Sequence, residues 1–290
     1  MRTGRKRAGW ALALLLCALP AFGGDERVSL RVAYGAARIY PYDINEYLGD
    51  FVRWRRDIGY TFPDAGLKTL DWTDGLEATL SVPLGAHVAA FVAIGRIGTA
   101  RNGNDIDAGV YQGTISYKRN DAVRSTVGRV GLSYAAALSG GLALRPHVSL
   151  DGYWTSFHDD GAEISTYNGQ GSNNDIVWSA DSTAFNVGWT VGATFDVALG
   201  AGLSVSLDAG WRHARTSGFV GTYREIDYGA PATTGDFRLF TYHDYVDWIP
   251  ATYRQLSLPG SYAEGVVRGL RDAAIDLSGV YASAGLRLSF

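Results

Sequence analysis

The chain has 290 residues, with 26 basic and 29 acidic side chains, 37 Gly, 17 Tyr and 8 Trp, but 1 Met and 1 Cys. The slight acidic excess argues against nucleic acid as a partner, because phosphate binding needs clustered Lys and Arg. A lone cysteine excludes a disulfide within the chain. Abundant glycine and aromatic residues are typical of a closed antiparallel sheet.

The first 23 residues predict a secretory signal peptide. They contain a basic start, an uncharged apolar run over 10–20, and small residues at positions −3 and −1 of a cleavage site after Gly23. The apolar run is about half of the ~20 residues that a spanning helix needs, so we expect cleavage rather than a retained anchor. Removal of 1–23 takes away Cys17 and four basic residues. The mature chain, 24–290, then has 22 basic and 29 acidic residues and a net charge of −7.

The segment 185–197 shows the strand pattern that dominates the mature chain. Its odd positions are all apolar, and its even positions are polar or glycine. Successive side chains of a strand point to opposite faces, so one face is apolar and the other polar. Thirteen such residues fit a tilted strand that crosses a bilayer. Similar segments are 28–36, 76–82, 130–138, 142–154, 203–211 and 280–290, and 87–99 is apolar on both faces.

The connections between these segments are alternately short and long. Outer-membrane barrels join their strands in this way, with tight periplasmic turns and long extracellular loops. We therefore predict an all-β fold, an antiparallel up-and-down transmembrane barrel of eight strands over 24–290. The segment 109–119 would allow ten strands, but it fits better as the outer part of a hairpin loop. The short turns are 83–86, 138–141 and 199–203, and the long loops are about 39–69, 101–122, 158–181 and 218–273.

The polar face of the strands distinguishes this barrel from a soluble β-sandwich or lipocalin-like barrel. It carries charges of both signs at mid-strand, while the opposite face is a belt of apolar residues that would be an untenable patch in water. An eight-stranded barrel has room inside only for its own side chains, and buried charges must be paired. We therefore predict a plugged interior with a salt-bridge network. The predicted network residues are Arg31, Glu77, Arg129, Arg145, His147, Asp151, Asp196, Asp208, Arg212 and Arg287.

The chain ends in the sequence Gly285-Leu-Arg-Leu-Ser-Phe290, with Leu286, Leu288 and Phe290 on the apolar face. This ending resembles the C-terminal signature of the small bacterial outer-membrane β-barrel superfamily, which includes the OmpA-, OmpX- and OmpW-type domains. Only this terminal segment matches by residue. The resemblance implies residence in the outer membrane, and insertion by the barrel-assembly machinery, which reads the C-terminal strand. It implies no single activity.

The first long loop contains a helical pattern over 43–57. An amphipathic helix here would pack on the barrel mouth, cap the lumen, or touch lipid headgroups through Arg53, Arg55 and Arg56. Its apolar positions are Ile44, Leu48, Phe51, Val52 and Trp54.

The third long loop is acidic and contains no Lys or Arg. Carboxylate and amide oxygens are ligands for Ca²⁺, but their spacing matches no EF-hand loop, so we favour a solvated acidic surface and predict no metal. The candidate ligands are Asp159, Asp160, Glu163, Asn173, Asn174, Asp175 and Asp181.

The fourth long loop is rich in aromatic residues, which are favoured at binding surfaces. We predict that Tyr242, Tyr245, Trp248 and Tyr253 form a contact surface, although a small core within the loop would also explain them. The segment 236–248 alternates and would extend the barrel wall, and 261–273 has the composition of a short helix.

No pattern in the chain predicts catalysis or a cofactor. No histidine stands beside a serine in the arrangement of the outer-membrane deacylases. The acidic pair next to His158 does not reproduce the geometry of the outer-membrane aspartyl proteases, and zinc spacing, phosphate loops and nucleophile elbows are absent. We therefore predict a non-enzymatic outer-membrane protein that contacts lipid and lipopolysaccharide and uses its loops for surface interaction or envelope integrity. A small porin is the alternative, and an outer-membrane hydrolase is less favoured.

Overall fold

The computed structural model describes residues 27–61, 68–99, 102–110, 113–167, 170–171, 175–227, 230–246, 251–257 and 268–290. The predicted signal peptide, 1–23, lies outside these ranges. Within them, no helix is long and apolar enough to cross a membrane. The described chain is one helix and many strands, and every strand pair is antiparallel, which confirms the predicted all-β antiparallel class.

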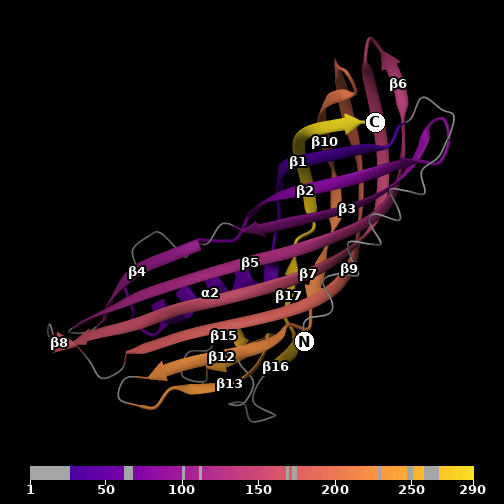
Figure 1. Ribbon diagram of the computed structural model, residues 1–290. Coiled ribbons are helices and arrows are strands. Elements are labelled where there is room, and N and C mark those ends of the chain that lie inside the picture. The colour runs from indigo at the N-terminus through magenta and orange to yellow at the C-terminus, as the bar shows by residue number, and fades with distance from the viewer. Residues whose placement is uncertain are drawn as a thin grey trace.

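Eight strands form a closed ring of hydrogen-bonded neighbours (Figure 1). The ring closes because β18 pairs with β1 from Ser29↔Ser289 onward, and because β7 pairs with β9. In ring order the strands are β1 (Ser29–Arg38), β2 (Trp72–Pro83), β3 (Val88–Thr99), β5 (Gly113–Tyr134), β7 (Leu142–Tyr167), β9 (Ile176–Gly200), β10 (Leu203–His213) and β18 (Gly279–Ser289).

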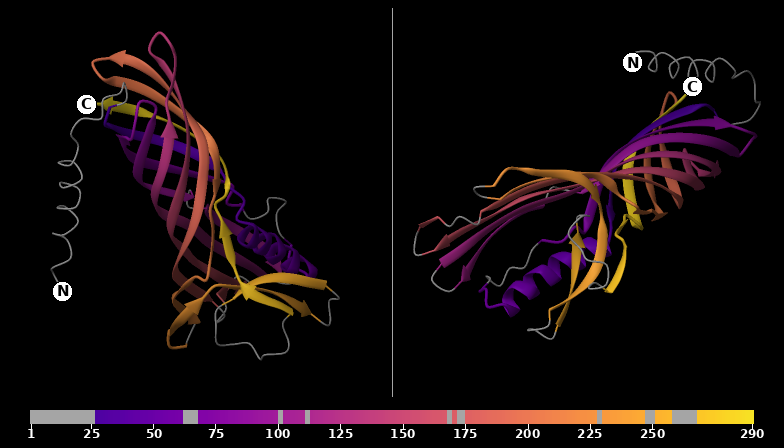
Figure 2. Two further views of the ribbon diagram at one scale, coloured as in Figure 1. Left: turned by 90° about the vertical axis from the view of Figure 1, so that its right-hand side faces the viewer. Right: turned by 90° about the horizontal axis from the view of Figure 1, so that it is seen from below.

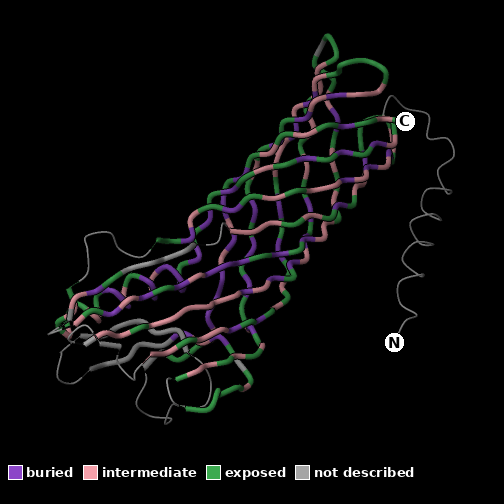
Figure 3. Tube along the Cα trace, turned by 60° about the vertical axis from the view of Figure 1, so that its left-hand side comes forward, coloured by how far each residue is buried: buried purple, intermediate pink, exposed green. Residues whose placement is uncertain are grey.

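Apolar side chains face outward from the ring and polar or small side chains face inward. On β1, Leu30, Val32 and Tyr34 are exposed, whereas Arg31 and Ala33 between them are buried. Figure 3 shows the same succession of buried and exposed positions along the neighbouring strands. Side chains alternate at every residue of a strand, so one register sets both faces.

The three short connections lie together at one end of the ring, which we call the turn end. In two of them glycine at positive φ makes the reversal possible, because it has no Cβ to clash. Gly140 and Gly141 have φ of 56° and 83°, and Gly200 and Gly202 have φ of 109° and 77°. The short strand β6 (Ala136–Ser139) completes the second hairpin against β7.

At the opposite end β5, β7 and β9 continue far beyond the ring. They have 22, 26 and 25 residues, against 10 to 12 in the other ring strands. Their extensions pair with one another, and the sheet is widened by β4 (Asn102–Val110), β8 (Gln170–Gly171), β12 (Val220–Asp227) and β13 (Thr233–Arg238). We call this sheet and the elements packed on it the outer lobe (Figure 1).

The outer lobe replaces the irregular loops expected at 101–122 and 158–181. Most of both segments is strand, and β4 with the start of β5 forms the hairpin anticipated at 109–119. The polar and glycine-rich composition of these segments hides their strand alternation. One face of the extended sheet is solvated, and only alternate residues, such as Ile115 and Tyr117, are buried in its core.

The predicted helix is α2 (Tyr42–Asp57), and it packs on the inner side of the extended sheet (Figure 2). Asp43 lies in its first turn and Arg55 and Arg56 in its last, which suits the helix dipole. Its apolar face enters a buried cluster in which the ring of Phe51 stacks on Tyr117 with centroids 4.7 Å apart. Other members of this cluster are Ile44, Leu48, Val52, Val123, Phe157, Phe219, Leu239 and Ile275.

Further strands close the lobe beside α2. Three form a separate sheet, β14 (Phe240–Val246), β15 (Ala251–Ser257) and β16 (Arg268–Asp272), and two form a pair, β11 (Arg215–Ser217) and β17 (Ala274–Asp276). The helix expected over 261–273 is therefore wrong for Arg268–Asp272, where pairing with β14 overrides local composition, and 261–267 lies outside the described residues. The alternating segment 236–248 extends the wall only as far as Arg238 and then enters the second sheet.

Substitution of Phe51 by Ala tests the core of the lobe. Removing a buried ring that stacks on Tyr117 leaves a cavity, and such changes cost about 3–5 kcal/mol. We expect amide hydrogen exchange in α2 to show a free energy of opening lower by about that amount. Arg53→Ala, at an exposed side chain of the same helix, should change it by about 0.5 kcal/mol or less. Equal exchange in the two variants would contradict this packing.

Candidate functional site

The ring interior holds a continuous polar network. At its turn end the carboxylate of Asp196 lies between two guanidinium groups, 2.7 Å from Arg145 Nε and 3.2 Å from Arg287 Nε. Ser206 donates a hydrogen bond to the same carboxylate, and Arg287 donates to Ser29. One buried carboxylate is thereby ion-paired with two cations at once.

The middle of the ring centres on Asp208. Arg31 donates to its Oδ2 at 3.1 Å, and His147 Nε2 lies 3.0 Å from its Oδ1. Arg31 also donates to Thr194 and Ser283, so this network joins strands from both sides of the ring.

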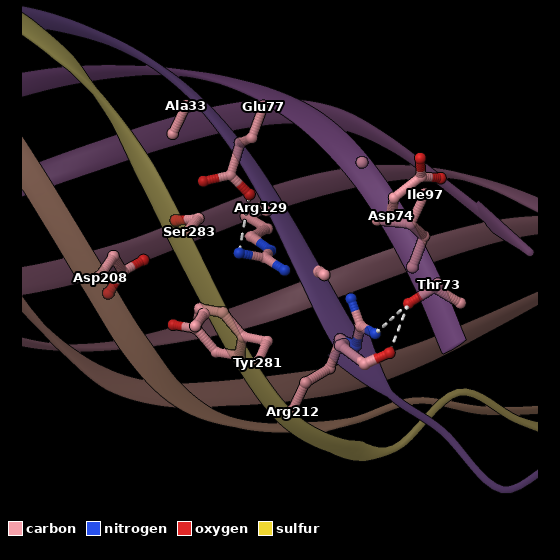
Figure 4. A pocket seen from close by; sticks show the side chains of 15 residues that line it. Ala33, Thr73, Asp74, Glu77, Ile97, Arg129, Asp208, Arg212, Tyr281 and Ser283 are labelled. Carbon is pink, nitrogen blue, oxygen red and sulfur yellow. Dashed lines mark hydrogen bonds and ion pairs between the residues drawn. The ribbon is translucent and has the colours of Figure 1, made fainter. Parts of the chain in front are cut away.

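The third part of the network lies toward the outer lobe (Figure 4). Arg129 is 2.7 Å from Glu77 and 3.5 Å from Asp151, and Tyr153 donates to Asp151 at 2.8 Å. Arg212 forms no ion pair that the structure describes. It donates to the carbonyl of Leu277 and to the hydroxyl of Thr73, and one of the dashed lines at Thr73 in Figure 4 marks the second of these bonds.

Two small cavities interrupt the network. One, of about 50 Å³, is bordered by Arg129, Arg212, Tyr281 and Thr73, and the other, of about 30 Å³, by Arg31, His147 and their neighbours. The Nε atoms of Arg31 and Arg129 and the Nδ1 atom of His147 are buried without a hydrogen-bond partner in the described part of the chain. Cavities of this size and polarity suit a few water molecules.

The lobe end of the ring is closed by apolar side chains. Past Arg129 and Asp151 the buried inward positions include Val127, Tyr153 and Phe157, each at most 2% exposed, interleaved with the small hydroxyl residues Ser125 and Thr155. Ile275 and Leu277 belong to the same buried cluster, which is continuous with the core around α2. The polar interior therefore ends against a hydrophobic core.

Arg119 is the hub that attaches α2 to the extended sheet. It is 2.9 Å from Asp121, 2.8 Å from Asp159, and donates to the hydroxyl of Tyr47 on α2 at 2.7 Å. Burial raises the pKa of Asp159 to about 6, and the Arg119 charge opposes that rise. The folded lobe therefore favours protonated Asp159, and this contribution to its stability falls as the pH rises from about 4 to 6.

Sequence reasoning missed this hub, although Arg119 and Asp121 are two residues apart and hence on one face of a strand. Two further ion pairs hold the helix: Arg55 to Glu163 at 2.7 Å, and Arg271 to Asp43. Asp43 also accepts a hydrogen bond from the Ala274 amide.

Most of the described acidic residues of 158–181 are partnered and only partly exposed, whereas Asp181 is exposed to solvent as expected. Asp159 and Glu163 pair with arginines, and Asp175 accepts the Ser165 amide. On the outer face His158 is clamped between Asp181, 2.7 Å from Nδ1, and Asp160, 2.6 Å from Nε2. Among the described residues no group of three or more His, Cys, Asp or Glu is placed to hold a metal ion, and Asn173 and Asn174 lie outside them.

One serine–histidine contact occurs in the described chain. Ser278 Oγ lies 3.4 Å from His213 Nδ1 and accepts the Ala214 amide at 2.9 Å. The His213 ring stacks on Trp189, and no described carboxylate contacts it. This pair lacks the acid that orients the base in a catalytic triad.

The remaining predicted residues are placed as follows. In the terminal segment, Gly285 packs against the β1 backbone, and Leu286, Leu288 and Phe290 face outward and are exposed. Tyr242 and Tyr245 lie in β14 and Tyr253 in β15, with side chains outside the described part, and all of Trp248 lies outside it.

No family model matches the chain, and no curated protein matches it significantly. Its function is therefore argued from the geometry above.

Replacing Asp196 with Ala tests the charge network. The change leaves Arg145 and Arg287 facing each other without their shared carboxylate, and breaking a buried pair costs about 3–5 kcal/mol. We expect a lower free energy of unfolding in a denaturant titration, whereas Asp227→Ala, at an exposed aspartate of β12, should leave it within about 0.5 kcal/mol. Similar losses in both variants would refute the network.

Replacing His158 with Gln tests the outer clamp. Hydrogen bonds to Asp181 and Asp160 raise the pKa of His158 against the lowering effect of burial. The stability from the clamp should therefore be complete below pH ~6.5, the ordinary pKa of His, and be lost as the pH rises through the raised pKa. We expect the difference in denaturation midpoint between wild type and variant to shrink from pH 5 to pH 9. A difference independent of pH would exclude a charged clamp.

Proposed function

We propose that this protein spans the bacterial outer membrane as an eight-stranded barrel, without enzymatic activity, and presents the outer lobe at the cell surface. The observation that carries the proposal is the polarity of the ring, which is charged and paired inside and apolar outside. A soluble barrel has the opposite arrangement. On this proposal 1–23 is the export signal, and the C-terminal strand is read by the barrel-assembly machinery.

The outward face supports contact with lipid. Ile94, Leu150 and Val187 are 64%, 64% and 59% exposed, and comparable residues lie on every strand of the ring. Monomeric soluble proteins rarely expose apolar patches larger than a few hundred Å², and a belt around the whole ring exceeds that. In a bilayer the same residues need no cover.

The interior supports a plugged barrel rather than a channel. Side chains and ion pairs fill the ring, the two cavities are about 50 and 30 Å³, and a hydrophobic core lies across the lobe end. An eight-stranded barrel is just wide enough to be filled in this way. The resemblance to small outer-membrane barrels agrees with this but names no activity.

The lobe supports a role in surface contact or envelope integrity. It is held to the ring by continuous strands, and α2 is fixed by three ion-paired arginines, Arg55, Arg119 and Arg271. Sites on such rigid elements hold a binding surface more precisely than mobile loops do. Its outer face is polar, with Lys118, Asp181 and Arg224 exposed.

Replacing Val148 with Arg tests the membrane orientation. Val148 is 53% exposed near the middle of the ring part of β7, and an arginine on the lipid face at mid-bilayer costs about 2–4 kcal/mol. We expect the variant to fold into bilayers with stability lower by that amount, and Val148→Leu to match wild type. Folding is read from the faster migration of unboiled protein on a gel.

The same preparation tests the plug. Wild-type barrel in a planar bilayer should show no discrete conductance steps, and such steps from folded monomer would overturn the plugged interior. If Val148→Arg were as stable as wild type, and the protein remained soluble and monomeric without detergent, the membrane assignment itself would be wrong.

A further inference from the structure

Four arginines project outward from the wall near the lobe end. Arg38 lies on β1, Arg96 on β3, Arg124 on β5 and Arg215 on β11, directly beyond β10. All four are exposed, and none forms an ion pair with a carboxylate that the structure describes. They differ in this from the ion-paired arginines of the interior, such as Arg31 and Arg129, and from Arg119 of the lobe hub.

The register brings these arginines to one level. The cross-strand partners of Ala36 can be followed from strand to strand around the ring in both directions. One direction leads to Thr183 on β9 and the other to Ala193, so the two paths reach β9 ten residues apart. Divided among the eight strands, this difference means that residues at the same height along the ring axis are offset from hydrogen-bonded partners by little more than one residue per strand. With that shift the four arginines lie within about two residues of a common level, roughly 7 Å along a strand.

This level is the edge of the apolar belt. Arg96 is the next outward residue after Ile94, and Arg124 is followed by Thr126 and then by the apolar Val130. Exposed tryptophans lie at the same level, with Trp72 opposite Arg38 and Trp154 opposite Thr126. Tryptophan is enriched where a bilayer meets water.

The two ends of the ring differ in charge. The three short turns, 84–87, 138–141 and 199–202, contain no Lys or Arg. Two acidic groups lie near the arginines, and both already accept hydrogen bonds: Asp74 from the Tyr34 hydroxyl, and Asp276 from the Ser278 amide. Asp276 lies opposite Arg215 in the β11–β17 pair and offsets part of its charge, but no ion pair that the structure describes includes any of the four arginines, so positive charge at the lobe end is available to an outside anion.

We propose that Arg38, Arg96, Arg124 and Arg215 form a cationic collar that binds the phosphate groups of phosphorylated lipid headgroups in the leaflet at the lobe end. The inference rests on the membrane-spanning function proposed above, because that function sets these side chains at headgroup depth. The guanidinium fork matches phosphate oxygens in a bidentate geometry and loses little hydration. Four such sites around the wall would fix the depth and tilt of the ring.

The experiment compares lipids that differ only in phosphate. Mature protein folded in zwitterionic detergent is titrated with bisphosphorylated lipid A, with dephosphorylated lipid A, and with inorganic phosphate. We expect wild type to bind the phosphorylated lipid at least about tenfold more tightly than the dephosphorylated one, since each basic residue near an anionic surface changes affinity about fivefold. The variant Arg38→Gln/Arg96→Gln/Arg124→Gln/Arg215→Gln should lose that preference.

Two matched variants control for charge and position. Arg27→Gln removes an exposed arginine that precedes β1 at the turn end and should bind like wild type, and replacement of all four collar residues by Lys should retain part of the preference. A quadruple Gln variant that keeps the preference, or wild type without one, would overturn the collar. Displacement of lipid A by millimolar inorganic phosphate would also overturn it, by showing a nonspecific anion site.

A gel run with and without boiling accompanies each titration. Wild type that does not fold as a heat-modifiable barrel would refute the membrane function itself. A folded wild type without phosphate preference would refute the collar alone.

Discussion

Enclosure of paired charges by the ring is the constraint on which the rest of the structure depends. Arg31 and Arg287 are direct neighbours across β1 and β18, an arrangement that is repulsive by itself. Each is paired with a carboxylate two strands away around the ring, Arg31 with Asp208 on β10 and Arg287 with Asp196 on β9. The pairing of β1 with β18, which closes the ring, is thus stable only with carboxylates from β9 and β10 in place. Closure of the ring therefore depends on the ion pairs inside it.

The same constraint fixes the outer surface. A slip of one residue in any strand would turn its inward charges outward and its apolar side chains inward. Asp151 illustrates the cost, because its carboxylate accepts a hydrogen bond from Thr190 on the neighbouring strand β9, and a one-residue slip of β7 would turn the carboxylate outward and break this bond. The apolar exterior and the polar interior are therefore two results of one register.

Local alternation was enough to predict the strands of the ring, their antiparallel class and the inward side of residues such as Arg31 and Asp196. It was not enough for the lobe. In β7 beyond Thr155 the outward residues include Ser156, His158 and Asp160, so the segment has the composition of a loop although it is paired throughout. The partners of Arg119 and of Asp43 were also hidden, because Tyr47 and Arg271 come from distant parts of the chain and meet them only through tertiary packing.

The long strands reverse their polarity along their own length, and this reversal defines the boundary of the belt. In the ring, β5 turns Val130 and Leu132 outward and Arg129 inward; in the lobe it turns Lys118 outward and Tyr117 inward. On the membrane-spanning function proposed above, a strand can serve both environments only if the reversal occurs at one level on all three neighbours, since a mismatch would expose an apolar face to water or bury a charge in lipid. On β5 the reversal falls between Arg124 and Val130, at the level of the four outward arginines. The change from a polar to an apolar interior and the change from an apolar to a charged exterior therefore occur at the same level.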